Sequence, residues 1–98
     1  MSKRRVVVTG LGALTPLGNS VSETWERLLA CESGIDYIKR FDTESFNVKI
    51  GGELKNLAIE DYLDRKEARR MDPFMQYGII ACMQAVQDAG LESLSEDQ

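Results

Sequence analysis

The sequence predicts a mixed α/β chain that begins with a buried strand and continues mainly as helices. Residues 5–8, Arg-Val-Val-Val, are expected to form that strand because β-branched side chains favour extended backbone. Gly10 and Gly12 follow, and residues without a Cβ allow another backbone to cross closely. Apolar residues then recur at helical spacing in two later stretches.

Length and composition indicate one small soluble domain. The 98 residues are 43% hydrophobic and 29% charged. No apolar run has membrane-spanning length, and no signal-peptide core follows the basic start, so we expect a cytoplasmic protein without membrane contact. The cysteines, Cys31 and Cys82, have no metal-like spacing and are expected to be free thiols. The sequence has no histidine, which excludes Ser-His-Asp chemistry and histidine-ligated metals within these residues.

The glycine pair imitates a dinucleotide-binding fingerprint and then departs from it. That fingerprint needs a third small residue and an immediate helix start, so that the helix N-terminus meets the pyrophosphate. Here Thr15 takes the third position, Pro16 disfavours helical backbone before it, and Gly18-Asn19 delay the helix. A stand-alone nucleotide-binding α/β domain therefore remains a disfavoured alternative.

The first helix is predicted to begin after Ser20. Ser20 and Glu23 fit a capping box, and Glu23 with Arg27 makes a favourable i,i+4 pair. Gly34 is expected to end the element in the left-handed conformation. One face of the helix is apolar and consists of Val21, Trp25, Leu28 and Leu29.

The middle of the chain is less regular. Alternating apolar residues predict a half-exposed strand over residues 46–50, and Gly51-Gly52 predict a bend after it. Residues 58–63 are expected to make one helical turn that directs Ile59, Tyr62 and Leu63 inward.

Two further helices have start signals. Asp64 with Glu67 repeats the capping pattern, and Asp72-Pro73 combines an N-cap with proline at the first helical position. The second of these helices, from Pro73 to Ala89, carries no formal charge before Asp88, and Gly90 is expected to cap its end. A helix this apolar must be covered on most faces, so its cover must come from beyond these residues. Its small residues form a line where a backbone can approach: Gly78, Ala81, Ala85 and Ala89.

Positive charge is concentrated at residues 65–70, Arg-Lys-Glu-Ala-Arg-Arg, which we call the basic cluster. The basic cluster carries a charge of +3, from four basic residues and one acid. The formal net charge of the whole chain is −4, so the other residues together carry −7. Apart from the basic N-terminus this is the only positive cluster, and a compact cluster on an acidic chain argues against non-specific nucleic-acid binding, which favours a broadly positive face.

Together these features resemble the N-terminal part of a β-ketoacyl-[acyl-carrier-protein] synthase, and the type II elongation synthase more than type I. The matching stretches follow one another along nearly the whole chain: residues 4–12, 15–18, 24–25, 33–35, 41–42, 65–74, 76–78 and 88–91.

The resemblance implies a thiolase-like layered αβαβα fold that is incomplete in this chain. Residues 1–98 would supply the first strand and helices of the N-terminal half. The family catalyses a decarboxylating Claisen condensation between malonyl-carrier protein and an acyl-enzyme thioester. The resemblance therefore also implies a homodimer that needs neither a cofactor nor a metal. An alternative is a ketosynthase-like chain-length factor, which lacks the nucleophile.

No catalytic residue is expected in this chain. The family nucleophile is a cysteine that follows Thr-Ala at a strand-to-helix turn, and two histidines assist it. Cys82 instead follows Ile80-Ala81 inside a helix, where burial would make it inert. Cys31 lies at the negative end of a helix, which disfavours a thiolate.

The resemblance does imply a docking site for acyl carrier protein. The family meets the acidic helix of its carrier protein with Lys and Arg, and Lys66, Arg69 and Arg70 stand at the matching positions, with Arg65 a weaker candidate. Lys66 and Arg70 are one helical turn apart and are expected to share a face. The competing interpretation of the basic cluster is an ordinary solvated helix face.

Overall fold

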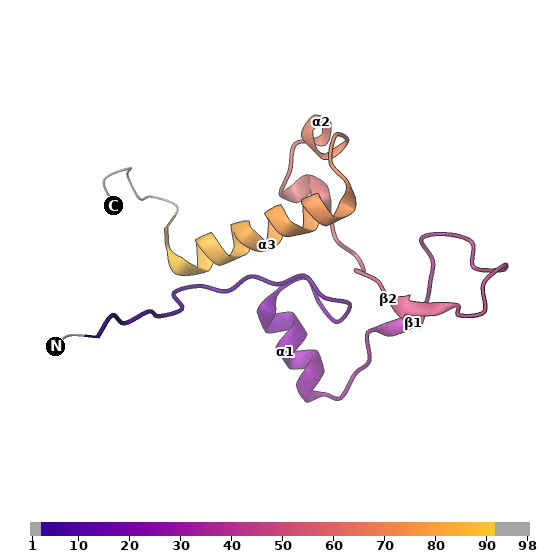
Figure 1. The fold of residues 1–98 in the computed structure, drawn as a ribbon, viewed down its shortest axis with the longest axis horizontal. Coiled ribbons are helices and arrows are strands. Elements are labelled where there is room, and N and C mark those ends of the chain that lie inside the picture. The colour runs from indigo at the N-terminus through magenta and orange to yellow at the C-terminus, as the bar shows by residue number, and fades with distance from the viewer. Residues whose placement is uncertain (1–2, 92–98) are drawn as a thin grey trace.

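The computed structural model describes residues 3–91 and shows an elongated arrangement of short elements. Its extents are 60 × 37 × 24 Å, and its radius of gyration is 17.4 Å. A compact domain of this length would have a radius of gyration of about 13 Å. Figure 1 shows the elements in order: α1 (Val21–Leu29), β1 (Ile35–Tyr37), β2 (Ile50–Gly52), η1 (Ile59–Asp61), α2 (Arg65–Ala68) and α3 (Pro73–Ala89).

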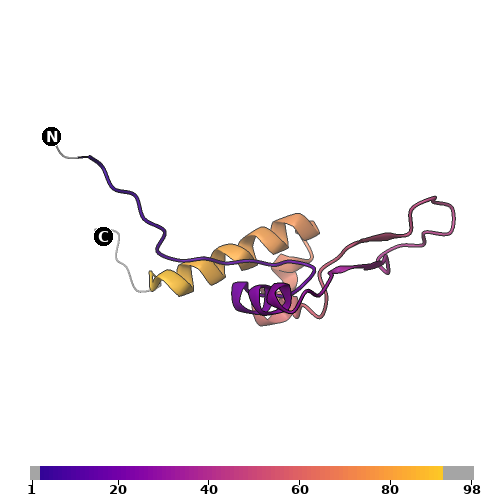
Figure 2. The same ribbon diagram turned by 90° about the horizontal axis from the view of Figure 1, so that it is seen from below.

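The N-terminal segment extends past the C-terminal end of α3, and only its later part runs alongside that helix, as an unpaired trace seen in both Figure 1 and Figure 2. The prediction of a buried strand at residues 5–8 is wrong for this chain, because within residues 3–91 the segment has no strand partner. Val6 is 95% exposed, and Val7 and Val8 are exposed as well. β propensity alone does not form a strand, since a strand needs a neighbour to take its hydrogen bonds.

The close crossing predicted at the glycine pair is confirmed. A Cβ on Gly10 would lie 2.7 Å from the Ala89 nitrogen, and one on Gly12 would lie 2.8 Å from the Ala85 nitrogen. Both obstructing atoms belong to the α3 backbone. Apart from its chain neighbours and its own helix backbone, Gly78 has no atom of residues 3–91 within 4 Å of its Cβ position, so the alanines of the small-residue line form the crossing without it.

Two side chains of α3 fasten the crossing segment. The Leu11 amide donates to the Asp88 carboxylate at 2.9 Å, and the Ala13 amide donates to the Gln84 side-chain oxygen at 3.1 Å. The extended segment therefore donates its amide hydrogen bonds to side chains of α3, in place of the carbonyl acceptors that a neighbouring strand would offer.

Helix α1 begins as predicted and ends differently. The Ser20 hydroxyl accepts from the Glu23 amide at 3.1 Å, and the Glu23 carboxylate pairs with Arg27 at 3.2 Å. The left-handed residue after the helix is Cys31, with φ of 59°, and not Gly34. Gly34 instead lies against the Pro16 ring, where a Cβ would come within 2.6 Å of the Pro16 Cβ.

The middle of the chain forms a small antiparallel hairpin. β1 pairs with β2 in the register Ile35↔Gly52 and Tyr37↔Ile50. The strand predicted over residues 46–50 therefore begins only at Ile50, and the glycines expected to make a bend belong to β2. β1 is three residues long, too short for a periodic signal, and the pairing across the hairpin decides where both strands lie.

The remaining helices follow their start signals. The turn predicted at residues 58–63 is the 3-10 helix η1, after which Leu63 is buried and Tyr62 remains exposed. α2 and α3 begin directly after Asp64 and Asp72, although neither carboxylate makes a capping hydrogen bond. Gly90 ends α3 in the left-handed conformation, with φ of 71°.

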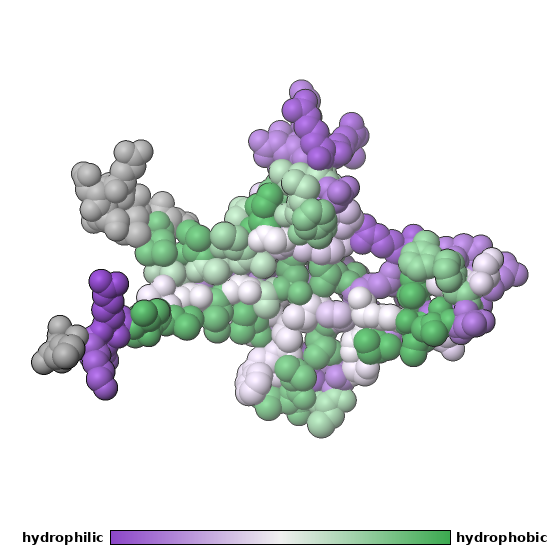
Figure 3. Space-filling view, in the orientation of Figure 1, coloured by the Kyte–Doolittle hydropathy of each residue, from purple (hydrophilic) through white to green (hydrophobic). Residues whose placement is uncertain are grey.

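The apolar faces of the helices are largely open to solvent in this chain. Within residues 3–91 the buried hydrophobic side chains are Leu63 and Ile80, whereas Phe74 on α3 is 73% exposed. Figure 3 shows apolar residues along α3 and the N-terminal segment. The expectation that these residues leave α3 uncovered is confirmed. No helix in this part of the chain is both long and apolar enough to cross a membrane.

Expressed alone, the 98-residue segment is expected to be marginally stable or to aggregate. Small domains bury a limited share of their surface, and exposed apolar faces associate in water. Thermal unfolding followed by circular dichroism, with size-exclusion chromatography, tests this. A sharp cooperative transition in a soluble monomer would show that the segment is a complete folding unit.

Candidate functional site

Neither cysteine lies in a catalytic arrangement. Both are free and exposed, so the burial expected for Cys82 is absent in this chain. Cys31 follows the C-cap residue of α1, as expected. Between residues 3 and 91 no three acidic or cysteine side chains gather into a metal site. A nucleophile with a partner base is therefore not assembled by these residues.

The basic cluster stands at an edge of the molecule, on α2 and the turn that follows it (Figure 1). Its four cationic residues are all exposed. None of them makes an ion pair or a side-chain hydrogen bond with any residue from 3 to 91. Their charges therefore face solvent and are available to an anionic partner. The residues are Arg65, Lys66, Arg69 and Arg70.

The geometry of the cluster differs from one continuous helix. α2 ends at Ala68, and the backbone then tightens, with the Arg70 amide donating to Glu67 at 3.1 Å and the Met71 amide donating to Ala68 at 3.2 Å. Arg70 therefore lies beyond the end of the helix that carries Lys66. The two residues were expected to share one helix face, but they lie on α2 and on the turn that follows it. Tightened last turns of this kind are common at helix termini.

The glycine-rich segment is not arranged as a phosphate site. Its Leu11 amide is already bonded to the Asp88 carboxylate, whose negative charge would repel a phosphate. Thr15 and Gly18 close a turn on each other through two backbone hydrogen bonds of 2.9 and 3.1 Å, and α1 starts only at Val21. The nucleotide-binding alternative needs a helix that begins directly after the glycines, so that its N-terminus can meet a phosphate. No helix begins there, because α1 starts only at Val21.

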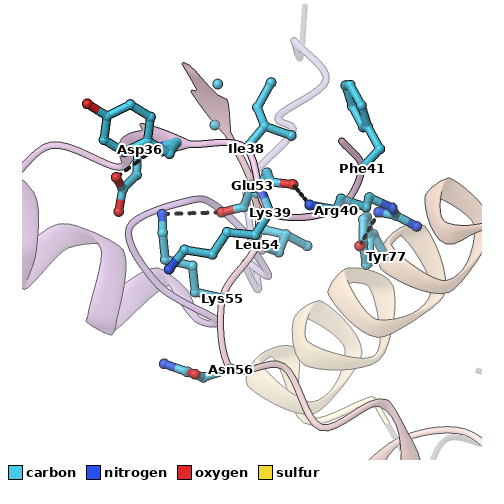
Figure 4. A pocket seen from close by; sticks show the side chains of 13 residues that line it. Asp36, Ile38, Lys39, Arg40, Phe41, Glu53, Leu54, Lys55, Asn56 and Tyr77 are labelled. Carbon is cyan, nitrogen blue, oxygen red and sulfur yellow. Dashed lines mark hydrogen bonds between the residues drawn. The ribbon is translucent and has the colours of Figure 1, made fainter. Parts of the chain in front are cut away.

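A second polar region lines an open cavity of about 840 Å³ beside the hairpin (Figure 4). The Glu53 carboxylate accepts from the Lys39 and Arg40 amides at 2.9 and 3.2 Å. The Arg40 guanidinium donates to the Tyr77 hydroxyl at 3.2 Å, and Lys55 Nζ donates to the Gly34 carbonyl at 2.9 Å. These groups join the hairpin to α3 and to the loop after α1. Sequence reasoning missed them because their partners lie 13 to 37 residues apart.

The comparison with protein families decides which fold this arrangement belongs to. The family model described as "Beta-ketoacyl synthase, N-terminal domain" matches residues 3–98. The chain belongs to the β-ketoacyl synthase family. The resemblance inferred from the sequence motifs is thus confirmed.

Curated relatives within the β-ketoacyl synthase family are close in sequence. The chain is 57% identical over 89 residues to "3-oxoacyl-[acyl-carrier-protein] synthase 2" of Staphylococcus aureus (strain COL), which covers 91% of this chain and 22% of the relative. It is 52% identical over 97 residues to the protein of the same name from Vibrio cholerae serotype O1, covering 99% and 23%. The chain therefore spans about a fifth of the length of these relatives.

A solved structure agrees on the synthase fold. "The ishigamide ketosynthase/chain length factor" superposes with a TM-score of 0.84 at 35% identity, over 98% of this chain and 23% of that one. The elements described above are thus the opening portion of a ketosynthase, thiolase-like fold. The prediction of an incomplete fold of this class is confirmed, and the open face of α3 is consistent with it.

Proposed function

We propose that residues 1–98 are the N-terminal segment of the first half of a 3-oxoacyl-[acyl-carrier-protein] synthase 2. The full-length protein would elongate acyl chains in fatty acid biosynthesis by condensing malonyl-carrier protein with an acyl-enzyme thioester. The observation that carries this proposal is the 57% identity to a relative of that name over 91% of the chain. The same proposal includes a cytoplasmic homodimer that uses no cofactor, metal, nucleic acid or membrane.

This segment would contribute scaffold and carrier-protein docking. In support, the exposed cations Arg65, Lys66, Arg69 and Arg70 find no acidic partner between residues 3 and 91. The sequence outside the basic cluster has the opposite net charge, and the cluster is its one concentration of positive charge apart from the N-terminal run Lys3-Arg4-Arg5, so an acidic helix of acyl carrier protein would be attracted to it. Each exposed ion pair contributes only about 0.2–1 kcal/mol, so the cluster acts mainly on encounter rate and orientation.

The chemical step would depend on residues outside this segment. Acyl transfer needs an activated thiolate, and the carbanion step needs donors that stabilise developing negative charge. Neither is assembled by residues 3–91, in which both cysteines are exposed at sites without a base, and the sequence has no histidine.

The 98-residue segment alone is therefore expected to show no condensing activity. The test supplies acyl-carrier protein and malonyl-carrier protein and measures the β-ketoacyl product, with the full-length protein as the positive control. Product above the no-enzyme control from the segment would overturn the assignment of catalysis to other residues. Absence of product from the full-length protein would count against the proposed activity.

A chain-length factor is the second candidate, because the superposed structure is titled a ketosynthase/chain length factor. The two candidates differ in residues that follow Gln98 in a full-length chain. A Thr-Ala-Cys sequence followed later by two histidines would indicate a synthase, whereas its loss would indicate the chain-length factor. The lower identity of 35% to that structure favours the synthase.

A further inference from the structure

The basic cluster lies on a helix too short to hold itself in place. α2 has four residues, and a single helical turn is unfavourable by itself because nucleation orders several residues for one hydrogen bond. Its N-cap residue, Asp64, makes no side-chain capping bond. The position of α2 therefore depends on contacts at its two ends.

Leu63 lies two residues before the first residue of α2 and anchors that end, because it is one of the two buried hydrophobic side chains among the described residues. At its end, Gln76 of α3 donates from Nε2 to the carbonyl oxygen of Ala68 at 2.8 Å. The same carbonyl accepts the Met71 amide at 3.2 Å, so two donors converge on the last residue of α2. Within the basic cluster, Ala68 is the half-buried residue and the others are exposed.

We propose that Gln76 is a positioning residue for carrier-protein docking. Its amide ties the end of α2 to the first turns of α3, and thereby sets where Arg69 and Arg70 project. Gln76 itself is half-buried and uncharged, so it would act through the basic cluster and not by touching the carrier protein. This inference rests on the docking role proposed above.

The experiment compares Gln76→Met with Gln87→Met in the full-length protein. Methionine keeps the length of glutamine and removes its donor. Gln87 is the matched control because it is also a glutamine of α3, and its side chain makes no hydrogen bond with residues 3–91 that the substitution would remove. We expect Gln76→Met to raise the KM for acyl-carrier protein by about threefold or more at low salt. The kcat with a small acyl thioester should not change, and Gln87→Met should match the wild type.

Two further measurements separate this inference from the docking proposal. Amide hydrogen exchange across residues 65–71 should become faster in Gln76→Met, whatever the role of the basic cluster. The KM effect of Gln76→Met should shrink when Arg69 and Arg70 are already changed to Glu, because a residue that acts through the cluster is not additive with it.

The outcomes are distinct. Unchanged exchange, or an unchanged KM in Gln76→Met when charge reversal does raise the KM, would overturn the role of Gln76 and leave docking intact. An equal rise in KM for carrier-bound and small substrates would also overturn it, since that indicates general damage. If charge reversal itself leaves the KM unchanged, the docking proposal fails, and the positioning role fails with it.

Discussion

Changing both Arg69 and Arg70 to Glu in the full-length protein is expected to raise the KM for acyl-carrier protein about five- to tenfold. Two exposed attractions are lost and two repulsions replace them, each worth a fraction of a kcal/mol, and about 1.4 kcal/mol corresponds to tenfold. Association should slow as well, because steering by the cluster is lost. Steady-state kinetics and stopped-flow binding at several salt concentrations measure both effects, which should be largest at low salt.

The control for this charge reversal is Lys3→Glu with Arg4→Glu, an exposed basic pair that changes the net charge by the same amount. It should leave the KM for acyl-carrier protein close to the wild-type value. Transfer from a small acyl thioester should be nearly unchanged in both double variants, because no reacting group is altered. Equal losses with both substrates would mean that Arg69 and Arg70 support the fold, and the docking assignment would be withdrawn.

Replacing Gly12 by Val in the full-length protein is expected to destabilise the fold by about 3 kcal/mol or more. A Cβ at this position meets the Ala81 carbonyl, lies 2.8 Å from the Ala85 nitrogen, and lies 2.9 Å from the Gln84 Cβ. Two of these atoms are backbone, so a side-chain rotation cannot relieve the clash. Denaturant unfolding and the yield of folded protein measure the effect.

The obstruction begins at Cβ, so Gly12→Ala should already produce most of the loss. Gly78→Ala on the same helix is the matched control, because within residues 3–91 the added methyl group has no atom within 4 Å other than those of its chain neighbours and its own helix backbone. Its effect should stay within about 1 kcal/mol, the range of helix propensity between glycine and alanine. A well-folded Gly12→Val variant that selectively lost nucleotide binding would contradict this role and revive the dinucleotide alternative.

Signals that depend on a few neighbouring residues were read correctly from the sequence. The Ser20 cap, the starts after Asp64 and Asp72, and the left-handed Gly90 all lie where expected. These signals lie within about one helical turn of the feature they predict: Ser20 caps α1 through a hydrogen bond, Pro73 suits a first helical position, and Gly90 readily takes the left-handed conformation. The charge of the basic cluster and the lack of histidine are likewise properties of composition, which no fold can alter.

Features that depend on distant partners were misread or missed. Residues 5–8 have strand propensity without a strand partner between residues 3 and 91, and β1 exists only because residues 50–52 pair with it. The sequence predicts Gly34 as the left-handed residue at the end of the first helix, but Gly34 lies closely against Pro16, and Cys31 takes the left-handed conformation.

The sequence by itself determined the family, the helix starts and the concentration of positive charge at residues 65–70. Tertiary structure alone decided how that charge is held, because the Gln76 amide reaches an Ala68 carbonyl eight residues earlier across a turn. It also decided which glycines permit close packing, since Gly12 meets α3 about 70 residues later, whereas no other segment of residues 3–91 lies against the Cβ position of Gly78. Propensities and caps act over a turn of helix, but packing joins segments whose separation in sequence leaves no local pattern.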